Sequence, residues 1–294
     1  MPELPDVEVY REALERRIAG GRLLRFELKN PFVLRTAVPP LETALGKRVH
    51  SVRRLGKRIV VALDDALYLV FHLMIAGRLR WLDADAKPPG RITLALFHFE
   101  SGRLAFTEAG TKRRASLHLV QGEEALAAFD MGGLDVDAAN YAAFESRLTG
   151  ENHTLKRALT DPRLFSGIGN AYSDEILHRA RLSPLALTSK LDASQRCRLH
   201  AATVEVLAEW THRLRALAGD AFPEKVTAFR PEMAVHGRYG QPCPVCGTPV
   251  QRIVYAENEC NYCASCQTGG TILADRALSR LLHASWPRSI DEVG

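Results

Sequence analysis

The sequence lacks any apolar run long enough to cross a membrane. Its longest such stretch, LYLVFHLMIAG at 67–77, contains His72 and is shorter than the roughly 20 residues that a spanning helix needs. The first residues carry Glu3, Asp6 and Glu8 where a secretory signal would have an apolar segment. We therefore expect a cytoplasmic protein without membrane contact.

Cysteine is scarce and unevenly placed. Only six cysteines occur in 294 residues, and five of them fall between 243 and 266. In a cytosolic chain, such clustering favours a metal site over disulfides. The stretch contains two Cys-x2-Cys pairs separated by 16 residues, which is typical of a structural four-thiolate zinc site. The predicted ligands of one zinc ion per chain are Cys243, Cys246, Cys263 and Cys266.

Cys260 leaves a second pairing open, because Cys260 and Cys263 have the same spacing as each of these pairs. We prefer the pair of Cys263 with Cys266, since Gly269 and Gly270 follow it and suit a turn. Cys260 is then expected to be a small buried residue.

A strong charge of either sign is also missing. The formal net charge is +5 and the pI is near 8.9. This balance is compatible with a polyanionic partner but does not require one.

The pattern of apolar and polar residues changes along the chain. Residues 5–19 predict an amphipathic helix, and 22–120 contain short runs rich in Val, Ile, Leu and Phe that predict antiparallel sheets. From 141 the pattern is helical, and a last stretch at 272–286 alternates apolar and basic residues at helical spacing. The length suffices for about two domains.

A glycine turn lies between two of the predicted helices, in SGIGNAYSDEIL. Gly167 and Gly169 permit a tight turn, and Asn170 is expected to cap the next helix. Free N–H groups at such a helix start can hold a phosphate, and Lys156 and Arg163 are near enough in sequence to add positive charge. Taken alone, however, a glycine turn between helices is usually just a turn.

The chain begins MPELPDVEVY. Trimming of Met1 before a small residue would leave Pro2 with a free secondary amine, which attacks carbonyl-like carbons to give an iminium ion. An α-amine titrates at roughly 7.7–8.0, so a useful fraction is neutral at pH 7. Glu3 stands beside it and could move protons. The alternative is that Pro2 and Pro5 merely start an N-terminal strand or turn.

Four motifs in this order resemble the formamidopyrimidine-DNA glycosylase and endonuclease VIII family of base-excision repair enzymes. They are PELPDVE at the start, RRLGKR around Lys57, GIGNAYSDEIL near the middle and the four-cysteine ribbon. The resemblance runs from residue 2 to about 267 and implies an α+β fold. An N-terminal helix and antiparallel β-sandwich would precede a helical helix–two-turn–helix domain that carries the zinc ribbon. The implied boundaries are 1–131 for the catalytic domain, 140–221 for the helix–two-turn–helix domain, 234–270 for the ribbon and 271–294 for a helical tail.

The resemblance also implies an activity. In this family the N-terminal proline attacks the anomeric carbon of a damaged nucleoside, releases the base and leaves an iminium link to the sugar. β-Elimination then cuts the strand, and δ-elimination often follows. Pro2 matches the nucleophile, Glu3 the neighbouring proton donor and Lys57 the lysine that assists elimination. Asn170 and Lys156 match residues that grip the DNA backbone.

The implied partner is double-stranded DNA that contains a damaged base or an abasic site. We expect a monomer that associates with the nucleoid when it is bound to DNA.

Several positions depart from the family pattern, and they leave the preferred lesion open. Asn258 stands where the ribbon usually has a phosphate-binding arginine, and Arg252 is a candidate to replace it. Ile75 stands where a methionine usually fills the gap left by the flipped base. Met74 is one step earlier and is expected to face the other side of a strand.

The second gap-filling stretch, TEAGTKRRAS, has no phenylalanine to intercalate between bases. Arg113 and Arg114 are the candidates to enter the duplex there. The loop at 219–235 is also expected to be shorter than the lesion-capping loop of the oxidised-guanine enzymes.

These departures motivate two alternatives to a glycosylase with AP lyase activity. One is an abasic-site lyase with little glycosylase activity, for which the Pro2 amine would suffice. The other is a non-catalytic zinc-ribbon protein that binds damaged DNA.

Overall fold

The computed structural model of the chain describes residues 1–83, 86–224, 226–227, 229–255, 258–274 and 287–292. The chain divides into two compact units. Unit 1 consists of residues 1–131 and 210–227, and unit 2 of residues 132–209 and 228–294.

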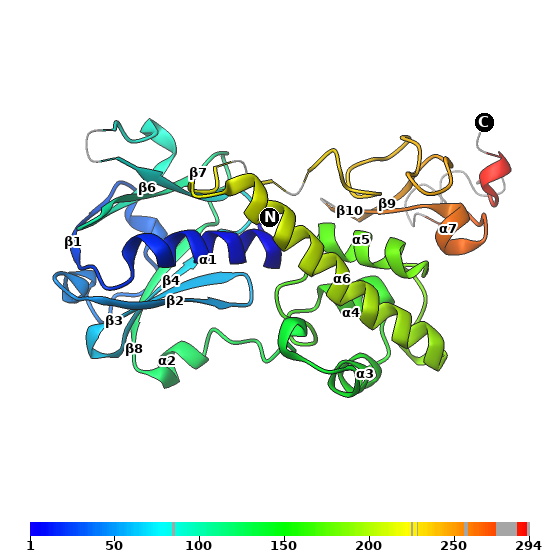
Figure 1. Cartoon of the computed structure of the whole chain (residues 1–294), viewed down its shortest axis with the longest axis horizontal. Coiled ribbons are helices and arrows are strands. Elements are labelled where there is room, and N and C mark those ends of the chain that lie inside the picture. The colour runs from blue at the N-terminus through cyan, green and yellow to red at the C-terminus, as the bar shows by residue number, and fades with distance from the viewer. Residues whose placement is uncertain (84–85, 225, 228, 256–257, 275–286, 293–294) are drawn as a thin grey trace. The chain divides into compact units, whose positions relative to one another are not determined.

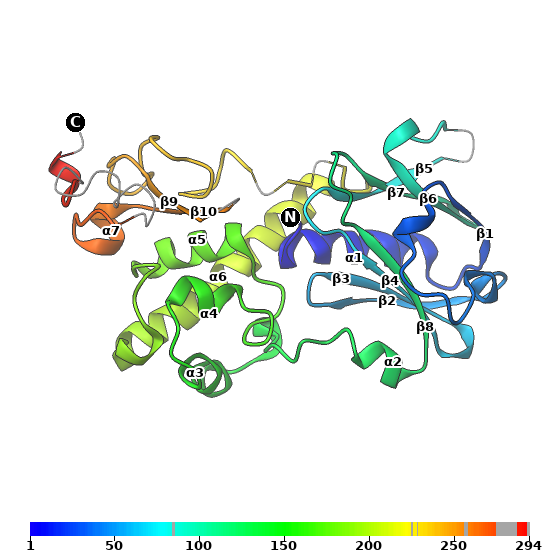
Figure 2. The same cartoon turned by 180° about the vertical axis from the view of Figure 1, so that it is seen from behind.

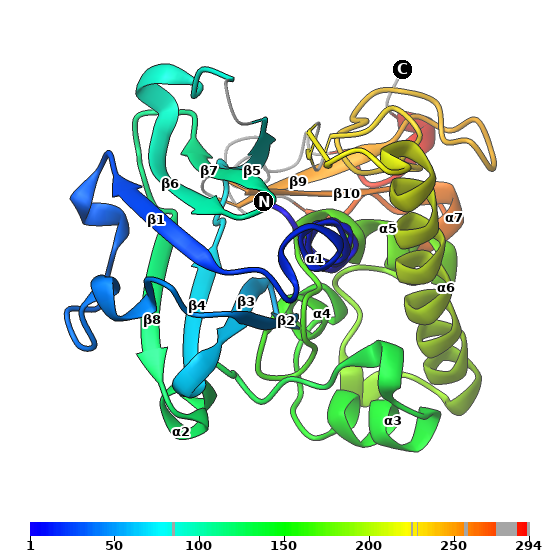
Figure 3. The ribbon, with the colours of Figure 1, turned by 60° about the vertical axis from the view of Figure 1, so that its left-hand side comes forward.

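Unit 1 begins with helix α1 (Leu4–Ile18), which confirms the predicted N-terminal helix. Glu3 is the N-cap residue, and its main-chain N–H donates to Asp6 Oδ2 at 3.1 Å. Pro5 lies in the first turn, where a missing N–H costs no intrahelical hydrogen bond. Because its apolar residues recur at helical spacing, α1 buries a continuous face against β2 and β3, beside which it lies in Figure 3.

Two four-stranded antiparallel sheets complete most of unit 1, as the alternation of apolar runs and turns predicts (Figure 1). The first sheet has the order β1-β6-β7-β5 and the second the order β2-β3-β4-β8. Their strands are β1 (Leu23–Leu28), β2 (Val49–Leu55), β3 (Arg58–Leu63), β4 (Leu67–His72), β5 (Gly77–Leu82), β6 (Thr93–Phe99), β7 (Gly102–Glu108) and β8 (Ser116–Gln121).

The two sheets share one hydrophobic core with α1. Phe71 of the second sheet meets Phe97 and Phe106 of the first edge to face, with ring centroids 5.3 and 5.6 Å apart. This is the expected sandwich. A short helix, α2 (Glu123–Ala127), follows the last strand.

Unit 2 is helical in its first part and carries the ribbon in its second (Figure 2). Its helices and strands are α3 (Tyr141–Thr149), α4 (Leu155–Thr160), α5 (Asn170–Ala180), the first part of α6 (Ala193–Ala218), the antiparallel pair β9 (Gln251–Tyr255) and β10 (Asn258–Tyr262), and α7 (Ala264–Thr268). Helices α4 and α5 with the turns between them are the predicted helix–two-turn–helix.

Each of the two units consists of two separate stretches of the chain, whereas each of the four predicted segments is continuous. From Trp210 onward, α6 and the residues up to 227 belong to unit 1. There Arg215 forms an ion pair with Glu12 of α1, with Nη2 2.6 Å from Oε1. The predicted boundaries therefore remain predictions.

The predicted tail helix at 272–286 falls mostly on 275–286, which lie outside the described residues. Among the residues that the structure describes, no helix is both long and apolar enough to cross a membrane.

Candidate active site and metal centre

The N-terminal amine lies in a buried, charged part of unit 1. Burial lowers the pKa of this amine, which Met1 carries here; Glu3 and Asp6 act to raise it, while Arg78 and Lys57 act to lower it. Glu3 is only 2% exposed. The structure thus brings the start of the chain together with two of the predicted catalytic side chains. Because the neutral amine is the nucleophilic form, burial favours the reactive state.

Lys57 reaches this cluster from a tight hairpin. Leu55 and Arg58 pair as the last and first residues of β2 and β3, so Gly56 and Lys57 form a two-residue turn. Gly56 has a φ of 60°, as the turns that match strand twist require. The position of the Lys57 ammonium is therefore set by a short, strongly specified element.

Two members of the cluster, Arg78 and Asp6, were missed by the sequence analysis. Arg78 lies on β5, where its Nε donates to the Val226 carbonyl at 2.6 Å and its Nη1 to the Gly77 carbonyl at 2.7 Å. Asp6 stands three residues after Glu3, the spacing of a capping interaction, and this signal could have pointed to it. Arg78 has no such local signal, because the sheet brings it to the N-terminus.

The expectation for Met74 was wrong. Residues 74–76 form a turn between β4 and β5, so the alternation of a strand does not apply to Met74 and Ile75. The turn is tight, because a Cβ on Gly77 would lie 2.2 Å from the Leu73 carbonyl oxygen. Ile75 is 57% exposed at this turn, where it is available to a partner.

Arg113 and Arg114 lie exposed on the connection between β7 and β8. The buried carboxylate of Glu108 fixes the backbone beneath them, accepting from the N–H groups of Arg114 at 3.0 Å and Ala115 at 3.1 Å. Arg113 Nη2 donates to the Arg91 carbonyl at 3.0 Å. A contact of either side chain with DNA remains a prediction.

The lowered pKa of His72, at the end of β4, predicts how acid affects the stability of the fold. Burial lowers its pKa from 6.5 to about 4, and the charges of Arg58, Lys57 and His118 act in the same direction. As pH falls from 6.5 toward 4, the unfolded chain takes up this proton before the folded chain, so stability should fall. A His72→Gln variant should lose this part of the pH dependence. Urea unfolding at pH 7 and pH 5 measures it, and an equal loss of stability in both proteins would refute the prediction.

In unit 2, the glycine turn differs from expectation at one residue. Gly167 has a φ of 80°, but Gly169, with an extended backbone, is the N-cap of α5. Asn170 is therefore the first helical residue, and the expectation that it caps the helix was wrong. Its side chain instead reaches the ribbon, where Nδ2 donates to the Glu259 carbonyl at 2.8 Å.

Lys156 makes several contacts inside unit 2. Its ammonium donates to the Asn170 carbonyl at 2.7 Å, to Ser173 Oγ at 2.8 Å and to the Asp174 carboxylate, and the side chain is 12% exposed. The second oxygen of Asp174 lies 2.8 Å from His236 Nδ1. Asp174 is fully buried, so Lys156 supplies a charge that this carboxylate needs.

The charge of Arg163 is also compensated locally. Its guanidinium binds both oxygens of Asp161, at 3.0 and 2.6 Å, and this hydrogen bonding lowers the pKa of Asp161 to about 2. Arg163 therefore adds less positive charge near the turn than the sequence suggests.

On the ribbon, Asn258 begins β10 and pairs with Tyr255 of β9. Arg252, the candidate to replace the missing arginine, lies near the start of β9, opposite Asn261. Its guanidinium stacks 4.3 Å from the ring centroid of Tyr239 and lies 3.5 Å from Glu259 Oε2. A role for Arg252 would therefore require it to leave these contacts or share them.

The four predicted cysteine ligands come together in unit 2. Their Sγ atoms all lie within 4.8 Å of one another, with close approaches of 3.4, 3.5 and 4.0 Å. A tetrahedral zinc ion with Zn–S distances of about 2.3 Å would hold its sulfurs about 3.8 Å apart, so this set fits such an ion. The four residues are Cys243, Cys246, Cys263 and Cys266.

Cys260 lies outside this group of four. It is fully buried on β10, where burial raises the pKa of its thiol well above the usual range. A thiol that stays protonated is a poor metal ligand. The structure thus supports the expectation of a small buried residue.

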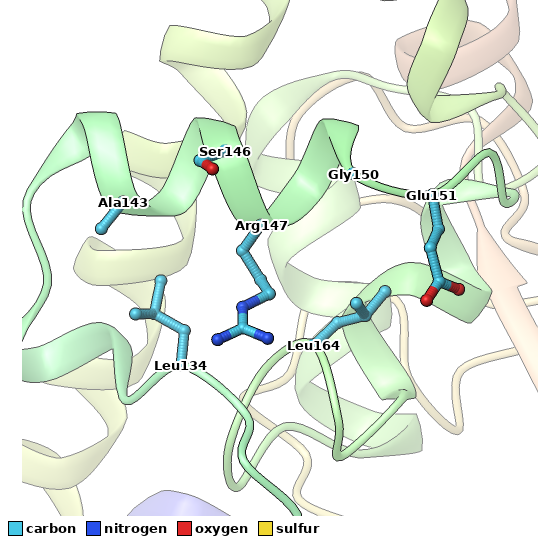
Figure 4. Close-up of a pocket in the computed structure, with 7 residues that line it drawn as sticks. All are labelled: Leu134, Ala143, Ser146, Arg147, Gly150, Glu151 and Leu164. Carbon is cyan, nitrogen blue, oxygen red and sulfur yellow. The ribbon is translucent and has the colours of Figure 1, made fainter.

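A hollow of about 460 Å³ lies beneath α3 in unit 2 (Figure 4). The guanidinium of Arg147 lies in it between Leu134 and Leu164 and donates to the Arg163 carbonyl at 3.4 Å. None of the predicted catalytic, DNA-binding or metal-binding residues lines this hollow. It gives no indication of the activity.

Comparisons with known proteins identify the family of the chain. A family model described as the formamidopyrimidine-DNA glycosylase N-terminal domain matches residues 1–115, and one described as the H2TH domain of the same enzyme matches 133–213. Formamidopyrimidine-DNA glycosylases of Desulforamulus reducens and Thermus thermophilus are 32% and 34% identical to the chain. These matches cover 91% and 92% of this chain and 99% and 100% of the relatives.

Among solved structures, the Lactococcus lactis Fpg in complex with DNA that contains an abasic site matches with a TM-score of 0.80 and 26% identity. The match covers 90% of this chain and 99% of that one. The chain belongs to the formamidopyrimidine-DNA glycosylase family.

Proposed function

We propose that the protein is a base-excision repair DNA glycosylase with AP lyase activity. Its substrate is double-stranded DNA that contains a damaged base or an abasic site. The observation that carries this proposal is the partly buried N-terminus, where burial lowers the pKa of the α-amine that Met1 carries here and the charges of Glu3 and Lys57 act on that amine. Membership of the family and the likeness to a relative solved on abasic-site DNA support it.

In the proposed reaction, the damaged nucleotide first leaves the base stack, at a cost of a few kcal/mol. The lone pair of the Pro2 nitrogen attacks C1′ of the sugar, and the bond to the base breaks with its electron pair going to the base. Glu3 lies beside the amine and is the group to transfer protons. The nitrogen then loses its proton, the C1′–O4′ bond breaks as O4′ takes up a proton, and the nitrogen lone pair forms the C=N bond of an iminium ion that joins Pro2 to the sugar.

The iminium ion then acts as an electron sink for strand cleavage. Loss of a proton from C2′ and departure of the 3′-phosphate complete β-elimination. The positive charge of Lys57 stabilises the phosphate in this step. A covalent intermediate of this kind replaces one difficult displacement by easier steps.

Contacts with the DNA backbone are proposed for Asn170, Lys156 and Asn258, where they would position the strand without reading its sequence. Ile75, Arg113 and Arg114 are proposed to occupy or border the gap left by the flipped nucleotide. The exposure of these last three side chains supports their assignment.

The metal is proposed to be zinc in a structural role, one ion per chain. Four cysteine sulfurs fill a tetrahedral coordination shell, so no position is left for water or substrate. The ion would hold the ribbon and take no part in the reaction. A monomer in the cytoplasm, at the nucleoid when bound to DNA, completes the proposal.

The experiment that tests the activity measures base release and strand cleavage separately, on duplexes with an abasic site, an oxidised pyrimidine or a ring-opened purine. Release of a base together with strand cleavage supports the full proposal. Cleavage of the abasic duplex alone would identify an abasic-site lyase, and binding of the duplexes without either product would identify a non-catalytic binding protein.

A Lys57→Ala variant should slow strand cleavage by ~100-fold while base release changes less, because the lysine acts on the departing phosphate. Lys47→Ala is the matched control, since Lys47 pairs with Asp65 on the surface of the same unit. Single-turnover assays measure strand cleavage on an abasic duplex and base release on a duplex with a damaged base. If Lys57→Ala cleaves as fast as wild type, Lys57 has no part in the mechanism.

A further inference from the structure

We propose that His178 is an outer-sphere partner of the metal centre, donating a hydrogen bond from Nε2–H to the Sγ of Cys243. The two atoms are 3.3 Å apart. His178 is only 6% exposed and lies in the last turn of α5, and Cys243 is also buried. In the proposed tautomer, the helix presents a polar hydrogen directly to one of the four sulfurs.

The chemistry of a metal-bound thiolate supports this assignment. A thiolate keeps lone pairs that accept hydrogen bonds after it has bound a metal, and a donor reduces the negative charge that four sulfurs concentrate at the centre. A neutral imidazole that donates from Nε2 carries no proton on Nδ1. The imidazole does not itself bind the metal, because the four sulfurs already form a complete tetrahedral set.

His178 is one of several points at which α5 is attached to the ribbon and the segment before it. At the start of the helix, Asn170 Nδ2 donates to the Glu259 carbonyl. In the middle, the buried Glu175 carboxylate accepts from the N–H groups of Val235 at 2.9 Å and His236 at 3.0 Å. At the end, His178 reaches a metal ligand.

These attachments link the metal centre to the start of α5. A bound metal fixes Cys243, and Cys243 orients the last turn of the helix whose first residue is Asn170. We infer that His178 stabilises the bound metal and helps to hold α5 against the ribbon. The inference rests on the metal centre proposed above, but not on the glycosylase activity.

The test compares His178→Phe with His200→Phe. The first variant keeps an aromatic ring in place but removes the N–H donor. The second makes the same change in unit 2, where His200 of α6 packs against Phe144 with ring centroids 5.0 Å apart. The rate of zinc release to a chromophoric chelator is measured on the folded, zinc-loaded full-length proteins, with the affinity from competition.

Loss of an outer-shell partner typically weakens metal binding by ~10–100-fold, and we expect His178→Phe to lie in this range. His200→Phe should stay within about twofold of wild type. Zinc release from His178→Phe at the wild-type rate would overturn the inference. A wild-type protein that purifies without zinc would instead refute the metal centre itself.

A second measurement needs no variant. In protein loaded with 113Cd, the proton on His178 Nε2 should be visible by NMR and should show a scalar coupling to the metal across the N–H···S hydrogen bond. A His178 ring protonated on Nδ1 alone would contradict the proposed donor, even if His178→Phe failed to fold.

Discussion

Replacing Pro2 by glycine should slow formation of the covalent DNA adduct trapped by borohydride without abolishing it, whereas blocking the Pro2 nitrogen by a retained Met1 should lower its yield by ~1,000-fold or more, as expected when a catalytic nucleophile is lost. Glycine is also trimmed of Met1, but its amine is primary and its backbone is not held by a ring. A preparation that retains Met1 should give no adduct, because its amine is displaced by about 3.5 Å along the chain. The assay is gel analysis of the trapped complex on an abasic duplex, with the N-terminal mass of each protein checked first.

Pro5→Ala is the matched control for this prediction. Pro5 is also a buried proline near the start of the chain, but it lies in the first turn of α1 and its nitrogen is part of a peptide bond. This variant should form the adduct like wild type. An undiminished adduct in protein that retains Met1 would show that another amine is the nucleophile.

Replacing one metal ligand, in Cys263→Ser, should abolish both zinc binding and tight binding of damaged DNA. The hydrophobic clusters of the ribbon are small. One consists of Val235, Val250 and the ligands Cys243 and Cys263, with Cys266 beside it, and the other of Ile253, Tyr262, Ala264 and Ile272. A structural zinc site supplies on the order of 10–16 kcal/mol of apparent binding free energy, so a core of this size should not fold without the metal. Unfolding of the ribbon would remove Asn258 and the Glu259 carbonyl that holds Asn170.

Cys260→Ala separates this effect from a general sensitivity to cysteine loss. Cys260 is buried three residues before Cys263 but lies outside the four-sulfur group. The variant should retain one zinc per chain and wild-type affinity for an abasic duplex, measured by metal analysis and by a binding titration. Zinc loss from Cys260→Ala, or normal DNA affinity of a zinc-free Cys263→Ser, would refute the proposed ribbon.

Periodic and closely spaced signals allowed the sequence to predict much of this structure. Each of these signals involves residues that are close together in the sequence. They are the apolar spacing of α1, the alternation of strands and turns, and the two cysteine pairs. Their physical causes are local, since they depend on backbone geometry and on the reach of a tight turn. The four-sulfur group is therefore found where the spacing predicts it.

The errors concern features that depend on backbone conformation or on distant contacts. A one-residue shift decided whether Gly169 or Asn170 caps α5, and sequence places helix ends poorly. Met74 and Ile75 follow an apolar run that looks like continuing strand, whereas the close approach of Gly77 to Leu73 makes a turn. Arg78 joins the N-terminal cluster through sheet pairing, of which its own neighbours give no sign.

The buried pairing of Lys156 with Asp174 has a consequence for any mutational scan scored by DNA binding. Removing one partner of a buried ion pair typically lowers the free energy of unfolding by about 3–5 kcal/mol, because the other charge stays buried without compensation. A damaged α5 would lower affinity whether or not the lysine ever touched a phosphate. In such a scan, a Lys156 variant would lose DNA affinity because of a folding defect and would be mistaken for a lost DNA contact. Replacing both Lys156 and Asp174 would distinguish the folding effect from a phosphate contact.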